Sequence, residues 1–234
     1  MIIEICANGF ESAQIAQNAG AQRIELCTNL SVGGLTPTYG EIEKVVSELN
    51  IPVHVLIRPR SGDFCYSESE LTQMLRDIAY CQQLGCAGVV SGVLTSEGKI
   101  DRVATQRLIT ATNGMEFTFH RAFDECSDWE NGFNFLLSAG VTRLLSSGQQ
   151  PKAINGIELL KTLKEIAQDK LQIMPGGGVN TQNVAAFKVA GFDMIHFSAT
   201  QKNTSASKNQ GMFSIETIGQ SNPQIIQDII EILT

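Results

Sequence analysis

The chain has 234 residues, of which 43% are hydrophobic and 18% charged, and its net charge is −7. This composition is typical of a folded globular protein and excludes a disordered or collagenous chain. The acidic balance provides no overall positive field, so we expect no nucleic-acid partner. No apolar run reaches the roughly 18 residues of a membrane helix, so we expect no membrane partner either. Residues 1–6 lack the features of a secretory signal, which predicts a cytoplasmic location.

Short runs of β-branched and apolar residues alternate with longer amphipathic segments from one end of the chain to the other. This alternation is typical of parallel strands joined by crossover helices. Eight strands are predicted, at Ile2–Cys6, Arg23–Cys27, Val53–Arg58, Gly88–Val93, Glu116–His120, Arg143–Ser147, Leu171–Pro175 and Met194–Ser198.

The predicted helices carry their own start and stop signals. Ser67 followed by Glu70 has the spacing of a capping box, and Thr36 followed by Pro37 is typical of a helix start. A glycine that closes a helix in the left-handed conformation fits the ends of several helices. The predicted helices are Phe10–Asn18, Leu71–Leu84, Trp129–Ala139, Val184–Ala190 and Gln224–Leu233.

Eight strand and helix units in one chain favour a single (β/α)8 barrel domain spanning residues 1–234. The alternative is an open doubly wound sheet, which would want a G-x-G-x-x-G turn after the first strand. Residues 6–12 do not supply that turn. The polar segment from Ala199 to Asn222 is predicted to be a long loop over the barrel mouth, or else a surface excursion without a role.

Activity in such barrels lies at the carboxyl ends of the strands, where this chain gathers charged residues. Arg58 and Arg60 fall on one face of the third predicted strand and its extension, and we expect them to form a fork for a carboxylate or phosphate. Glu25 lies on the second predicted strand nearby. A structural ion pair between Glu25 and Arg58 is the alternative interpretation.

His120 ends the fifth predicted strand and is the best single candidate for proton transfer. A structural histidine that packs beside Phe119 remains the alternative. His196, in the last strand, is placed to face the same cavity as His120.

A run of three glycines follows the seventh strand. Gly177 and Gly178, with Ser198 after the eighth strand, resemble the anion cradle that many such barrels build from their last two loops. A tight turn without a ligand is the alternative.

The six cysteines include no C-x-x-C pair, which argues against a zinc site of the usual spacing, and we expect free thiols. Cys6 and Cys27 end neighbouring strands in the same alternation phase. They are therefore candidates for a two-coordinate Cu(I) site, although two cysteines that simply pack in the core would give the same pattern.

Several blocks of the sequence resemble those of the CutC family of copper homeostasis proteins. The resemblance implies a TIM-like barrel, a cytoplasmic location and copper binding. It also implies a pocket that contains Glu25, Arg58, Arg60, His120, Arg121 and Asp124, with Cys27 as a copper thiolate. The blocks that carry it are Arg23–Cys27, Gly33–Pro37, Ile57–Arg60, Gly62–Tyr66, Thr118–Asp124, Ser147–Gln149 and Asn209–Met212.

Two functions are therefore expected as alternatives. The first is a CutC-like copper homeostasis protein that binds Cu(I) through Cys6 and Cys27. The second is a barrel enzyme that acts on a small anionic, for instance phosphorylated, metabolite, and homo-oligomers are common among such barrels. In the enzyme, Glu25, His120 and Asp124 would be catalytic, and the substrate would contact Arg58, Arg60, Arg121, Gly177, Gly178, His196 and Ser198.

Overall fold

The structure is a computed structural model that describes residues 1–201 and 219–234. Eight parallel strands form one sheet in the order β7-β6-β5-β4-β3-β2-β1-β8, and a further bridge between Gly176 and His196 joins its two ends. The predicted barrel is therefore confirmed. The strands are β1 (Ile2–Asn8), β2 (Arg23–Cys27), β3 (Val53–Leu56), β4 (Gly88–Ser91), β5 (Glu116–Phe119), β6 (Arg143–Ser146), β7 (Gln172–Pro175) and β8 (Met194–Phe197).

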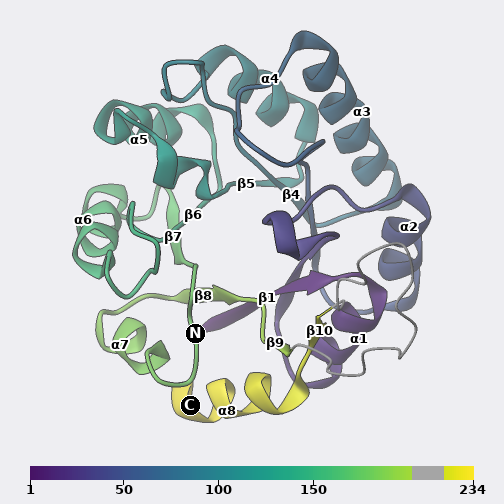
Figure 1. Ribbon diagram of the computed structural model, residues 1–234, viewed down its shortest axis with the longest axis vertical. Helices are drawn as coiled ribbons and strands as arrows, with labels where there is room; N and C mark the ends of the chain where they lie inside the picture. Colours follow the sequence, from purple (N-terminus) through teal and green to yellow (C-terminus); the bar gives the residue numbers. More distant parts are fainter. Residues whose placement is uncertain (202–218) are drawn as a thin grey trace, which may run out of the picture.

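Helices surround this ring of strands on the outside (Figure 1). Two short 3-10 turns, η1 (Leu30–Val32) and η2 (Arg121–Glu125), follow β2 and β5. No helix in residues 1–201 or 219–234 combines the length and the apolarity that a membrane span requires. The helices are α1 (Phe10–Asn18), α2 (Tyr39–Glu48), α3 (Glu68–Leu84), α4 (Arg102–Thr112), α5 (Trp129–Ala139), α6 (Ile157–Ala167), α7 (Val184–Val189) and α8 (Pro223–Leu233).

Of the two helix starts predicted from capping chemistry, one is confirmed and the other is wrong. Ser67 and Glu70 form the expected capping box at the start of α3. The predicted start at Thr36 and Pro37 is wrong, because α2 begins at Tyr39 with Thr38 as its cap. Thr36 is used elsewhere: its N–H donates to the carbonyl of Arg58, and its hydroxyl accepts from the Arg58 N–H.

Successive side chains of each strand point alternately to the helices outside the barrel and to the barrel interior. In β1, Ile3, Ile5 and Ala7 belong to the main apolar core, which also contains the buried faces of the helices. Glu4 and Cys6, in the other phase, belong to the barrel interior, where Glu4 meets charged partners from both neighbouring strands. The interior is therefore largely polar, and its apolar residues form two small separate clusters.

The predicted loop from Ala199 to Asn222 lies largely outside the described residues. Its described ends form a short antiparallel pair, β9 (Thr200–Gln201) with β10 (Gln220–Ser221). The pair leads directly into α8, whose cap is Asn222.

Candidate functional site

A cavity of about 680 Å³ opens at the carboxyl ends of the strands. This location is the one that barrel architecture predicts for a functional site. Residues from all parts of the described chain converge on it. Its lining includes ten of the candidate residues: Cys6, Glu25, Arg58, His120, Arg121, Asp124, Gly177, Gly178, His196 and Ser198.

Two cysteines meet at the base of this cavity. The Sγ atoms of Cys6 and Cys27 lie 3.6 Å apart, and both side chains are buried. Cys6 borders the cavity, whereas Cys27 lies behind it with its thiol directed at the carbonyl oxygen of Ala7. The hydrogen bond with Cys27, followed by burial, raises the pKa of the Cys6 thiol well above its ordinary value. Both cysteines therefore belong to one compact cluster of soft donors.

His196 lies beside the thiols and connects the first and last strands. Its Nδ1 lies 2.8 Å from Glu4 Oε1 and 3.8 Å from Glu25 Oε2. Burial would lower the pKa of His196, but hydrogen bonds to Cys6 and Glu4 and the charges of both glutamates raise it well above the ordinary value. The imidazole is therefore protonated at neutral pH and carries a positive charge next to the thiols.

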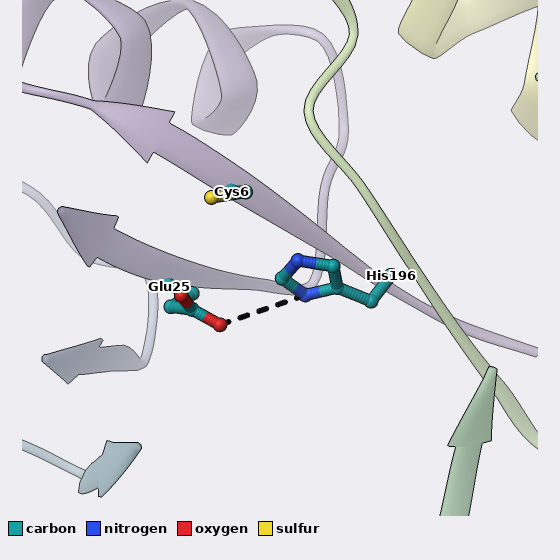
Figure 2. Close-up of side chains that lie close together, drawn as sticks. All are labelled: Cys6, Glu25 and His196. Carbon is teal, nitrogen blue, oxygen red and sulfur yellow. Dashed lines mark ion pairs between the residues drawn. The ribbon is translucent and has the colours of Figure 1, made fainter. Parts of the chain in front are cut away.

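Glu25 completes a cluster of three different donor types. A sulfur of Cys6, an oxygen of Glu25 and a nitrogen of His196 all lie within 4.8 Å of one another. Figure 2 shows Glu25 and His196 pointing toward one another, with Cys6 beside them on β1. Burial raises the pKa of Glu25 to about 7, opposed by the charge of His196 and assisted by that of Glu4. The cluster is therefore able to hold a metal ion once Cys6 and His196 have released their protons, and Glu25 exchanges protons near neutral pH.

Glu4 is ion-paired at the floor of this cluster. It accepts a hydrogen bond from Arg23 Nε as well as its bond with His196, and it is fully buried. Burial would raise the pKa of Glu4, but the hydrogen bond and charge of His196 and the charge of Arg23 lower it well below its ordinary value. Glu4 is therefore ionised, and it fixes the orientation of His196.

The loop after β6 is held in place by Asp124. Its two carboxylate oxygens accept hydrogen bonds from the hydroxyls of Ser146 and Ser147, from the N–H groups of Ser147 and Gln149, and from Arg121 Nε. Because both oxygens are engaged inside the protein, these contacts favour a positioning role for Asp124, and the catalytic role expected from the sequence stays a prediction. Arg121 is likewise drawn to the loop, since its Nη2 donates to Ser147 Oγ at 2.9 Å.

The two glycines after β7 have positive φ angles, which glycine adopts more readily than other residues. Gly177 has a φ of 107° and Gly178 a φ of 71°. A Cβ atom on Gly177 would lie 3.1 Å from the Arg121 Cζ, so the bare backbone allows the guanidinium to approach closely. Both glycines and Ser198 border the cavity, and anion binding there stays a prediction.

Comparison with known proteins agrees with this architecture. The profile of the CutC family matches residues 1–201. A CutC family protein from Histophilus somni is 47% identical over 209 residues, which cover 89% of this chain and 86% of the relative. One from Glaesserella parasuis is 42% identical, over 97% of this chain and 94% of the relative.

The chain belongs to the CutC family.

Solved structures agree with this assignment. A CutC protein from Streptococcus agalactiae, named for copper homeostasis, has a TM-score of 0.80 at 36% identity and covers 85% of this chain and 98% of its own. A phosphoribosylanthranilate isomerase from Pyrococcus furiosus has a TM-score of 0.59 at 15% identity, over 100% of this chain and 98% of its own. The second likeness shows a shared fold and nothing about function.

One member of the CutC-like pocket predicted from sequence lies elsewhere. Arg60 does not border the cavity, and the expected fork of Arg58 with Arg60 is not formed. The guanidinium of Arg60 donates instead to Glu70 at 2.6 Å, to Asp63 at 3.0 Å and to the carbonyl of Cys65 at 2.8 Å. The physical reason is that β3 ends at Leu56, so the alternation of a strand no longer applies at position 60.

The alternative ion pair between Glu25 and Arg58 is also not formed among the described residues. Glu25 makes its charged contact with His196, at 3.8 Å. Arg58 instead donates to backbone carbonyls. The two opposite charges therefore border one cavity of this CutC family member without neutralising each other.

Replacing Asp124 by asparagine tests its role as the anchor of the loop. One oxygen then becomes an NH2 group that faces hydrogen-bond donors, so we expect a loss of about 1–3 kcal/mol in the free energy of unfolding. Urea denaturation followed by circular dichroism measures the change. Asp193→Asn is the matched control, because Asp193 forms an exposed pair with Lys164, and little change is expected. Equal effects of the two variants would contradict the assignment.

Proposed function

We propose that this CutC family protein binds one Cu(I) ion through the thiolates of Cys6 and Cys27. The observation that carries the proposal is the 3.6 Å separation of two buried Sγ atoms at the base of an open cavity. Soft thiolate ligands favour Cu(I) over the harder divalent ions that carboxylates prefer. Membership of a family named for copper homeostasis supports the same ion.

The surroundings of the two thiols fit this ion. Leu30, Leu56 and Val90 pack around Cys6 and Cys27, which limits access of water to the sulfur atoms. Two thiolates with one monovalent cation leave a single negative charge. The protonated imidazole of His196 lies beside Cys6 and compensates that charge, so the buried site would be close to neutral when loaded.

The alternative of an acid–base enzyme has less support. Of its three expected catalytic residues, Asp124 has both carboxylate oxygens engaged with the loop after β6. Glu25 and His120 line the cavity, and Glu25 Oε2 and His120 Nε2 make no hydrogen bond among the described residues. We therefore take copper binding as the function that the site supports best.

A titration of the reduced protein with Cu(I), in competition with a chelator under anaerobic conditions, tests the proposal. We expect one tightly bound ion per chain. Because the raised pKa keeps Cys6 protonated at neutral pH, the ion must displace a proton. The apparent affinity should therefore rise by about tenfold per pH unit for each proton released between pH 6 and 8.

Two comparisons make this test decisive. Cys65→Ser removes a cysteine that does not border the cavity, and it should leave the stoichiometry and affinity unchanged. Zn²⁺ serves as the competing metal. A tighter complex with Zn²⁺ than with Cu(I), or a Cu(I) affinity that does not vary with pH, would contradict the proposal.

A further inference from the structure

A second group of cavity residues follows β3 and β5, and copper binding makes no use of it. Arg58 is buried, and its terminal nitrogens are occupied by backbone carbonyls. Nη1 donates to Val32 at 2.8 Å and Gly34 at 3.0 Å, and Nη2 donates to Gly62 at 2.8 Å. The Nε–H of Arg58 is buried and has no partner in the described part of the chain. The hydroxyl of Tyr66, which interacts with the same guanidinium, is likewise buried without a regular hydrogen bond. Because Arg58 borders the cavity, we take its Nε–H as a donor that a bound ligand would satisfy.

Among the described residues, the charge of Arg58 also lacks a counterion. No carboxylate in residues 1–201 or 219–234 lies within ion-pair distance of its guanidinium, although the side chain is only 6% exposed. The carbonyl partners are neutral dipoles, and the ring of Phe64 lies 5.0 Å from the Arg58 Cζ without carrying charge. A buried cation without an anion is costly, and an anionic ligand would remove that cost.

His120 offers a second unpartnered N–H beside the same ring. Its Nδ1 accepts a hydrogen bond from the N–H of Ala122 at 3.2 Å, so the proton of the neutral ring lies on Nε2. That Nε2 is buried and has no partner among the described residues, and His120 is one of the residues that line the cavity. The rings of Phe64 and His120 lie 4.9 Å apart, which places the Arg58 and His120 side chains against one aromatic wall.

The ring of His120 remains neutral under ordinary conditions. Burial, together with the charges of Arg58 and Arg121, lowers the pKa of His120 to about 3. At neutral pH the ring therefore donates from Nε2 and adds no second positive charge. The wall thus combines one charged and one neutral N–H donor.

We propose that Arg58 Nε–H and His120 Nε2–H together bind the carboxylate of a small organic acid. Two N–H donors match the two oxygens of a carboxylate, and one cationic donor matches its single charge. A phosphate group has three acceptor oxygens and a larger charge, which this pair alone leaves unsatisfied. A cavity of about 680 Å³ has room for an acid of several carbon atoms. The proposal does not rest on copper binding, because neither Cys6 nor Cys27 takes part.

Calorimetric titration of the metal-free protein with lactate, malonate and succinate tests this subsite, with inorganic phosphate as the comparison anion. We expect at least one of these carboxylates to bind, and to bind more tightly than phosphate. His120→Asn keeps an acceptor for the N–H of Ala122 but removes the donor at the Nε2 position. It should weaken carboxylate binding about tenfold or more, and His120→Gln, which restores an N–H near that position, should recover part of the loss.

Further variants separate this site from its neighbours. Arg58→Gln removes the cation and should weaken binding further, and the His120 variants keep the test valid if that protein does not fold. Arg60→Gln removes an arginine outside the cavity and should leave binding unchanged. Cys27→Ser should also bind the carboxylate normally, so failure of the copper proposal would be recognised separately. Absence of carboxylate binding by the wild type, or wild-type affinity in His120→Asn, would overturn the proposal.

Discussion

Replacing Cys27 by serine is expected to abolish tight Cu(I) binding while leaving the fold intact. Serine has nearly the same shape, and its hydroxyl is able to donate to the carbonyl of Ala7 as the thiol does. A neutral hydroxyl is a poor ligand for a soft ion, and one remaining thiolate, at Cys6, cannot hold it alone. Loss of a residue that only hydrogen-bonds to a metal ligand costs about 10–100-fold in metal affinity. Loss of a direct ligand should therefore cost at least about a hundredfold.

The measurement is the chelator competition described above, repeated on Cys27→Ser, Cys6→Ser and Cys126→Ser. Cys126 is buried like Cys27 but belongs to the main core outside the cavity, so its substitution controls for the loss of a buried thiol. Cys6→Ser should match Cys27→Ser, and Cys126→Ser should match the wild type. Retention of wild-type affinity by Cys27→Ser would remove the thiol pair from the copper site.

Replacing Glu4 by glutamine is expected to cause a large loss of stability. The change preserves the shape of the side chain but leaves Arg23 buried without its carboxylate partner, and removes the closest anion from His196. Removing one partner of a buried ion pair costs about 3–5 kcal/mol, because the other charge is left uncompensated. Urea denaturation at pH 7 measures this difference in the free energy of unfolding.

The pH dependence of that loss distinguishes an electrostatic cause from poor packing. The pKa of Glu4 is lowered in the folded protein, so the wild type gains stability from this group above the unfolded pKa of about 4.3. That gain disappears as the pH falls from there toward the folded pKa, so the wild type and Glu4→Gln should converge in acid. Glu68→Gln, which breaks an exposed pair with Arg107, should change stability far less at any pH. A deficit in Glu4→Gln that is independent of pH would indicate packing.

The barrel was predictable because a short run of β-branched and apolar residues marks each strand locally in the sequence. All eight predicted strands are present, and their ends differ from the structure by at most two residues. The residue at which a helix begins was harder to predict. Thr36 and Thr38 offer the same capping chemistry, and only the contact of Thr36 with Arg58 in the folded barrel decides between them.

The candidate site was predictable where it depends on neighbouring strands. Cys6 and Cys27 share an alternation phase on β1 and β2. Cys6 lies opposite Glu25 in the register, so Cys27 is its diagonal neighbour on the same face. The interaction of Glu4 with His196 joins residues 192 positions apart and exists only because β8 pairs with β1, which no local pattern encodes. The different fates of Arg58 and Arg60 likewise depend on where β3 ends.

The two walls face one and the same cavity, and this has a thermodynamic consequence for the ligands that would bind to them. Copper at the β1 and β2 wall and an organic acid at the β3 and β5 wall would be linked ligands. Any factor by which one of them strengthens or weakens retention of the other must apply equally in the reverse direction. Supply of the acid would then set how readily the protein releases its metal, and the metal load would set how readily it releases the acid.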